Sequence, residues 1–137
     1  MQNNTITVQA TILAPIAKVW EYYNTPEHIM NWNNASPDWH SPSAENDLRT
    51  GGSFKYRMEA KDGSAGFDFE GVFDLVKEPN ILNYTIGDRR VEVSFKEIDG
   101  ATEAKVIFEM EHENPEEMQR QGWQAILDNF KKYVENN

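Results

Sequence analysis

The sequence predicts an α+β domain in which a curved antiparallel sheet of six to seven strands wraps around one long C-terminal helix. Two Asp-Gly dipeptides, Asp62-Gly63 and Asp99-Gly100, lie between segments in which apolar and polar residues alternate. Such a dipeptide is the strongest short-range sign of a β-hairpin. A long amphipathic segment ends the chain, and the length of 137 residues with 39% hydrophobic residues suits one domain with a substantial core. We therefore expect residues 1–137 to form a single domain.

The N-terminal part is expected to supply one strand and two short helices. Residues 5–13 alternate between apolar and polar side chains, which is typical of a half-buried strand. A helix with apolar residues at helical spacing follows Pro15. Thr25-Pro26 then predicts the N-cap and the first residue of a second helix that ends near Trp32.

Residues 33–46 are rich in Asn, Ser, Pro and Asp and show no clear period. They are predicted to form a loop, with a short strand near its end, at residues 45–49, as the alternative. The loop carries Trp39, a side chain that is rarely left in water. We expect Trp39 either to close over a bound molecule as a gate or to be a fixed plug against the short helices.

Five further strands are predicted, at residues 54–60, 66–76, 81–86, 89–98 and 101–111. A two-residue loop at each Asp-Gly pairs apolar with apolar residues on one face and opposite charges on the other, as a correct register requires. The expected pairs are Met58–Phe67, Arg57–Asp68, Val93–Val106 and Lys96–Glu103. Two-residue connections at 79–80 and 87–88 add Leu75–Tyr84 and Tyr84–Val91.

The last element is predicted to be a long, deeply buried helix. Asn114 is the expected N-cap, Pro115 the first helical residue, and Glu117 the acid of a capping box. Two adjacent apolar stripes cover more than half of the helix circumference, with Trp123 at its centre. Gly122 is expected to allow a close approach of the helix to the sheet.

Charge and composition exclude several classes of function. The formal net charge is −10 and there is no basic cluster, so we expect neither nucleic acid nor an anionic membrane surface as a partner. The absence of cysteine excludes disulfides, thiolate zinc sites and thiol nucleophiles. The N-terminus does not resemble a signal peptide and no segment approaches transmembrane length, so a cytoplasmic protein is expected.

Short motifs form an ordered set along nearly the whole chain. They are AP..KVW at 14–20, TPEHIMNW at 25–32, GG.F at 51–54, FEG at 69–71, EP at 78–79 and GWQAIL at 122–127. This set resembles the START-like (SRPBCC) superfamily, and within it the branch named for the activator of the heat-shock-protein-90 ATPase, whose bacterial members are often labelled polyketide-cyclase-like. The resemblance implies the helix-grip fold. It carries no catalytic residues over, because its signature residues are mostly structural.

The aromatic residues of the expected inner face are the candidate binding residues. One helix rarely fills the concavity of such a sheet, so the remaining space would be an apolar pocket; dense packing of the same rings is the alternative. The candidates for binding a ligand are Trp32, Trp39, Tyr56, Phe69, Tyr84, Phe108, Trp123 and Phe130. The hydroxyl groups of Tyr56 and Tyr84 are the candidates for hydrogen bonding to it.

No motif for catalysis or for a metal is found. The three histidines, His28, His40 and His112, have no metal-ligand spacing, and Glu109 and Glu111 are expected to face solvent. We therefore expect no metal, no cofactor and no catalytic residue; a histidine at the mouth of the pocket that acts as a general base is the alternative to surface histidines.

Three functions remain open at this stage. The first is a small binding protein for an apolar or amphipathic molecule held between sheet and helix. The second is a cyclase- or hydrolase-type enzyme that uses the same cavity. The third is a co-chaperone-like protein-interaction domain, which only the resemblance implies.

Overall fold

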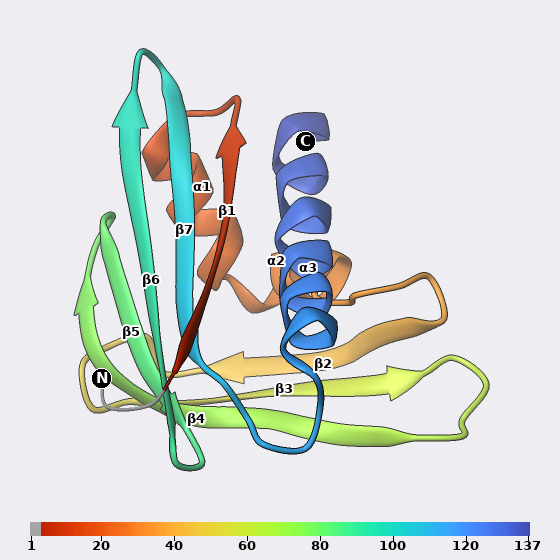
Figure 1. Cartoon of the computed structure of the whole chain (residues 1–137). Helices are drawn as coiled ribbons and strands as arrows, with labels where there is room; N and C mark the ends of the chain where they lie inside the picture. The colour runs from red at the N-terminus through yellow and green to blue at the C-terminus, as the bar shows by residue number, and fades with distance from the viewer. Residues whose placement is uncertain (1–3) are drawn as a thin grey trace.

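The computed structural model describes residues 4–137 (Figure 1). Its elements are β1 (Thr5–Ile12), α1 (Ile16–Asn24), α2 (Pro26–Trp32), β2 (Trp39–Asn46), β3 (Ser53–Ala60), β4 (Gly66–Lys77), β5 (Ile81–Ile86), β6 (Arg89–Ile98), β7 (Ala101–Glu109) and α3 (Glu116–Asn136). The seven strands form one antiparallel sheet in the order β1-β7-β6-β5-β4-β3-β2. The predicted fold class is confirmed.

The sheet bends strongly, so that β2, β3 and β4 run roughly across β1, β7 and β6, and α3 stands inside the bend (Figure 1). Helix α3 packs mainly on the edge strand β1, and it also contacts the two short helices α1 and α2. It is held there by the fully buried ring of Phe130, whose centroid lies 5.0 Å from that of Tyr23 and 4.9 Å from that of Trp32. These contacts hold α3 near one side of the bend, so its backbone does not lie over the middle strands β3, β4 and β5.

The predicted registers of the two Asp-Gly hairpins are confirmed. Met58 lies opposite Phe67 and Arg57 opposite Asp68, while Val93 lies opposite Val106. Lys96 likewise lies opposite Glu103. At the second turn both Asp99 (φ 51°) and Gly100 (φ 83°) are left-handed, as a type I′ turn requires.

The predicted register of β4 against β5 is wrong, by one residue from Leu75 to Lys77 and by two residues at Val72 and Phe73. The turn between them holds three residues, because Lys77 pairs with Ile81. The register then shifts between Phe73 and Leu75, so Phe73 and not Leu75 lies opposite Tyr84. A bulge of this kind inserts one extra residue and restores the inward orientation of the side chains that follow.

Residues 39–46 form the edge strand β2, so the predicted loop is wrong in most of its length. Trp39 pairs with Ala60, and the register shifts between His40 and Ser43, around Pro42. Proline lacks the backbone N–H of a ladder and is tolerated in a sheet at edges and bulges. Pro42 made the sequence look unlike a strand. At the edge of a sheet, however, the missing N–H of a proline does not break the ladder.

The N-terminus of α3 also differs from the expected capping box. Pro115 occupies the cap position, and no side chain caps the helix. The side-chain amide of Asn114 donates instead to Glu111. Glu117 pairs with Arg120 at 3.6 Å.

Two glycines have opposite surroundings. A Cβ atom at Gly71 would lie 2.2 Å from the backbone oxygen of Thr85, so this glycine is required where β4 approaches β5. A Cβ atom at Gly122 would meet nothing within 4 Å. The expected close approach of the helix at Gly122 is therefore wrong.

These surroundings predict opposite effects of the same substitution. Gly122→Ala should raise the free energy of unfolding by about 0.5–1 kcal/mol, because alanine loses less backbone entropy in a helix. Gly71→Ala should lower it by about 1–3 kcal/mol, because the strand must move to admit the methyl group. Urea unfolding followed by circular dichroism measures both. A loss of stability in Gly122→Ala would contradict the open space beside that residue.

Candidate ligand-binding cavity

A cavity of about 290 Å³ lies between the concave face of the sheet and α3. Its wall is mostly apolar and is built from α1, α2, the strands β3 to β7 and α3. Phe67 belongs to the lining and is 49% exposed, so the cavity opens to solvent at this end of β4. The volume is at the lower end of the range typical of small-molecule sites.

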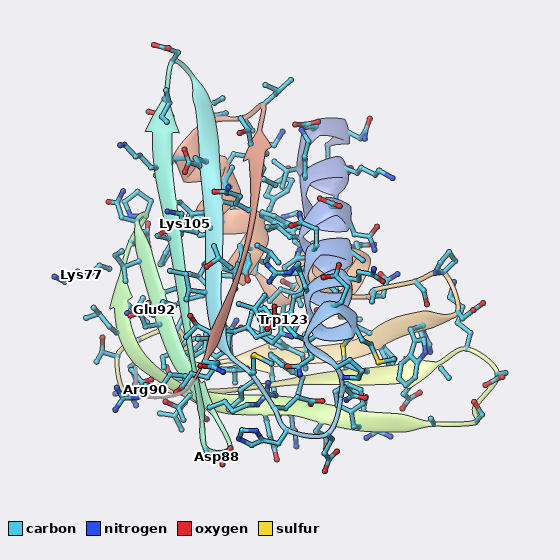
Figure 2. The ribbon with its side chains drawn as sticks, in the orientation of Figure 1. Lys77, Asp88, Arg90, Glu92, Lys105 and Trp123 are labelled. Atoms are coloured by element: carbon cyan, nitrogen blue, oxygen red, sulfur yellow. The ribbon has the colours of Figure 1, made fainter. Side chains whose placement is uncertain are left out.

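Six of the eight candidate binding residues line the cavity: Trp32, Tyr56, Phe69, Tyr84, Trp123 and Phe130. They alternate along the inner face of β3, β4 and β5 or project from α2 and α3. Figure 2 shows Trp123 projecting from α3 toward the sheet, whereas Lys77 points away on the outer side. Their role in binding stays a prediction.

Phe108 does not line the cavity. Its side chain is fully buried on β7, and its ring stacks on that of Trp123 with centroids 4.1 Å apart and planes 13° apart. Phe108 therefore supports the indole that forms the wall. Sequence alternation placed both rings inside but could not show which ring covers the other.

Trp39 does not line the cavity either. It is held in the β2–β3 ladder opposite Ala60, and its ring lies 6.0 Å from that of Phe67. The loop that the gate requires is a strand here, so the predicted loop gate is wrong. The ring of Trp39 lies beside the exposed Phe67; its role as a fixed plug stays a prediction.

Three tyrosines and one asparagine bring polar atoms to the apolar wall. Tyr23, Asn24, Tyr56 and Tyr84 all belong to the lining. The side-chain amide of Asn46 donates to the Tyr56 hydroxyl at 3.1 Å and to the backbone oxygen of Asn24 at 2.7 Å. The sequence missed Tyr23 and Asn24, because their helical spacing indicated only packing and a helix end.

Burial keeps these phenols neutral. Desolvation raises the pKa of Tyr56 from 10.0 to about 12, against the opposing hydrogen bond from Asn46. The pKa values of Tyr23 and Tyr84 are raised further by desolvation and by the neighbouring phenols. In a charged form, the loss of hydration would outweigh the stabilisation that Asn46 gives Tyr56 and that Arg89 gives Tyr84.

Charged side chains also reach the cavity. Arg89 on β6 and Glu111 after β7 line it. Glu109 is 4% exposed, and its Oε1 accepts the backbone N–H of Arg90 at 2.6 Å, so its expected place in solvent is wrong. Strand alternation failed here because the Glu109 carboxylate folds back onto the backbone at the start of the neighbouring strand β6.

The histidines lie outside the cavity lining. His28 stacks on Tyr22 at 3.9 Å and hydrogen-bonds through Nδ1 to the hydroxyl of Tyr133 at 2.7 Å. His40 lies 4.0 Å from Glu59 on the β2–β3 edge. Within residues 4–137, no cluster of three or more His, Asp or Glu side chains is placed to hold a metal ion.

The raised phenol pKa values predict loss of stability at high pH. The unfolded chain releases the phenol protons near pH 10, while the folded chain keeps them to about pH 12 or above. The free energy of unfolding should therefore be unaffected by these groups below pH 10 and should fall above it, by about 1.4 kcal/mol per pH unit for each group. Tyrosinate absorbance and circular dichroism followed together against pH would measure this. Tyr84→Phe should make the fall shallower; full ionisation of all tyrosines near pH 10 in the folded protein would contradict the burial.

Known proteins share both the fold and the sequence of this chain. Residues 13–135 match the family described as "Activator of Hsp90 ATPase homolog 1-like protein". The solution structure of an AHSA1-like protein from Aeromonas hydrophila is similar with 43% identity and a TM-score of 0.92 over 97% of this chain and 93% of that one. Chr148 from Cytophaga hutchinsonii is 52% identical with a TM-score of 0.84 over the same shares.

More distant structures share the fold alone. CV1439 from Chromobacterium violaceum has a TM-score of 0.84 at 19% identity, over 98% of this chain and 99% of that one. No curated protein matches the chain. The family match spans nearly the whole chain and agrees with the two more similar structures. The chain therefore belongs to the family of proteins like the activator of Hsp90 ATPase homolog 1.

Proposed function

We propose that this protein binds a small apolar or amphipathic molecule in the cavity between the sheet and α3. The observation that carries the proposal is the 290 Å³ space itself, bounded by the rings of Trp32, Phe69 and Phe130 and open near Phe67. A dry apolar cavity of roughly 150 Å³ suffices to bind benzene. The space here suits a molecule of about two fused rings.

The site is built as a binding surface for flat apolar molecules. Trp123 is braced by Phe108 at 4.1 Å, and Phe54 contacts Tyr84 and Phe73 with centroids 5.1 Å apart in both pairs. Rings held by other rings lose little side-chain freedom when a ligand binds, so less ordering entropy opposes binding. The acidic composition, with a net charge of −10, favours neutral or cationic over anionic ligands.

We also propose that the chain is a single domain that works in the cytoplasm. Separately, no helix of residues 4–137 has the length and hydropathy to span a bilayer.

One observation favours an enzyme as the second candidate. Arg89 and the carboxylate of Glu111 line the same cavity as the phenols, and a carboxylate with phenol donors is a usable set for acid–base chemistry. A cyclase or hydrolase of this kind would change the bound molecule. Mass spectrometry of a molecule co-purified from the native host, before and after incubation with the protein, separates binding from turnover.

Filling the cavity with a larger side chain should weaken binding. The dye 1-naphthylamine, which has two fused rings and is neutral at pH 7, should gain fluorescence and raise the melting temperature of the wild-type protein. Ile126→Trp places a large ring in the lining and should weaken dye binding at least tenfold, because the ring takes the space of the dye.

Two controls accompany this test. Val72→Trp adds the same ring at a position 46% exposed on β4 and outside the lining, and His40→Ala removes a side chain outside the cavity. Both should leave dye affinity within about twofold of the wild type. A wild-type protein that binds no neutral aromatic dye would overturn the proposed function and favour the protein-interaction alternative.

A further inference from the structure

Polar atoms without protein partners gather on one part of the cavity wall. The side chain of Asn24 is 3% exposed and lines the cavity; its Nδ2 donates to the backbone oxygen of Trp20 at 3.0 Å. Its Oδ1 has no hydrogen-bond partner among residues 4–137. A buried carbonyl oxygen left in this way is costly, and such atoms are rare in native structures.

The phenols next to Asn24 have unused donors. Within the described chain, the hydroxyl groups of Tyr23 and Tyr84 make no hydrogen bond, and that of Tyr56 accepts from Asn46. A hydroxyl has one donor and two acceptor positions, so the Tyr56 proton is also available. The three phenols come from α1, β3 and β5 and all line the same cavity, and the side-chain amide of Asn46 joins the Tyr56 hydroxyl to the backbone oxygen of Asn24. The wall thus offers up to three O–H donors beside one amide acceptor.

The surroundings select against a negative charge. Tyr23 packs between the rings of Trp32 and Phe130, with centroids 5.1 Å and 5.0 Å away. Tyr84 packs on Phe54 and Phe69, at 5.1 Å and 6.3 Å. The burial that keeps these phenols protonated also disfavours an anion placed beside them. Of the two charged residues in the lining, Glu111 repels an anion and Arg89 attracts it, so the lining carries no net positive charge to offset this cost. A neutral oxygen acceptor avoids this cost and still receives hydrogen bonds.

We infer that the cavity recognises a neutral, largely apolar molecule with a carbonyl oxygen and an adjacent hydrogen-bond donor. The hydroxyl groups of Tyr23 and Tyr84 donate to the carbonyl oxygen, and the donor of the ligand satisfies Asn24 Oδ1. Tyr56, held by Asn46, is the third donor of the same subsite. This inference rests on the proposed function, because it names the chemical class of molecule that the cavity takes.

A set of matched naphthalenes tests the inference. The probes are 2-naphthamide, which has both groups; 2-acetylnaphthalene, which has the carbonyl alone; 2-isopropylnaphthalene, which has neither; and 2-naphthoate, which is anionic at neutral pH. Affinities are measured by tryptophan fluorescence and calorimetry. In the wild-type protein, 2-naphthoate should bind more than tenfold more weakly than 2-naphthamide.

Tyrosine variants separate hydrogen bonding from packing. Tyr23→Phe and Tyr84→Phe should each lower the affinity for 2-naphthamide relative to 2-isopropylnaphthalene by about threefold to tenfold, the value of one hydrogen bond. Tyr22→Phe, outside the lining, should leave this ratio unchanged. The carbonyl carbon of ¹³C-labelled 2-naphthamide should move downfield on binding, and less so in the Tyr84→Phe variant.

The outcomes distinguish the two proposals. If the naphthalenes bind but the ratio does not change in either tyrosine variant, the carbonyl subsite is wrong and the binding function stands. If 2-naphthoate binds more tightly than 2-naphthamide, the preference for a neutral ligand is wrong, and the binding function again stands. If none of the four probes binds, both the subsite and the proposed function are wrong. Because the wild-type comparison needs no variant, a variant that fails to fold leaves the test intact.

Discussion

The position of α3 determines the rest of this structure. The helix rests on the edge strand β1, and its buried Phe130 locks against Tyr23 of α1 and Trp32 of α2. An anchor at one side of the bend keeps the helix away from the middle strands, where β3, β4 and β5 present an aromatic face. The cavity follows from this offset, because side chains alone must fill the space that the backbone of α3 does not reach.

The bend that makes room for the cavity has causes in single residues. At Gly71 the two strands β4 and β5 come so close that a methyl group would meet the oxygen of Thr85. A register shift follows within the next few residues of β4, and a second one lies between His40 and Ser43 on β2. Bulges increase the local twist of a sheet. Together they turn the sheet so that its inner face curls around the helix and does not lie flat beneath it.

Alternation and turn chemistry made the hairpins predictable, because a shift of one residue would have moved Phe69 or Val93 to the wrong face. The same alternation found Tyr56, Phe69 and Tyr84, since a strand residue faces either in or out, and helical spacing found the other three cavity residues, Trp32, Trp123 and Phe130. Both patterns failed where a residue obeys another rule. Pro42 made the edge strand β2 look like a loop. Tyr23 and Asn24 lie on a helix, where the same spacing is found for residues that pack and for residues that bind, so the spacing did not identify them as cavity residues. Gly122 gave no sign of its surroundings, because no local pattern records how near α3 comes to the sheet.

The phenols show why a cavity of this composition points beyond packing. Phe54 and Phe73 occupy the same wall as Tyr84 and fill it without polar atoms. The hydroxyl groups of Tyr23 and Tyr84 have no hydrogen-bond partner among the described residues, so they add nothing to packing that a phenylalanine ring would not supply. The amide oxygen of Asn24 is buried without a partner in the same region, at a cost of about 1–3 kcal/mol. A cost of this size is a sizeable fraction of the stability of a small domain. A bound molecule that supplies the missing partner converts this cost into a hydrogen bond and uses the phenol donors, so the arrangement that weakens the empty fold is the one that gives the cavity its selectivity.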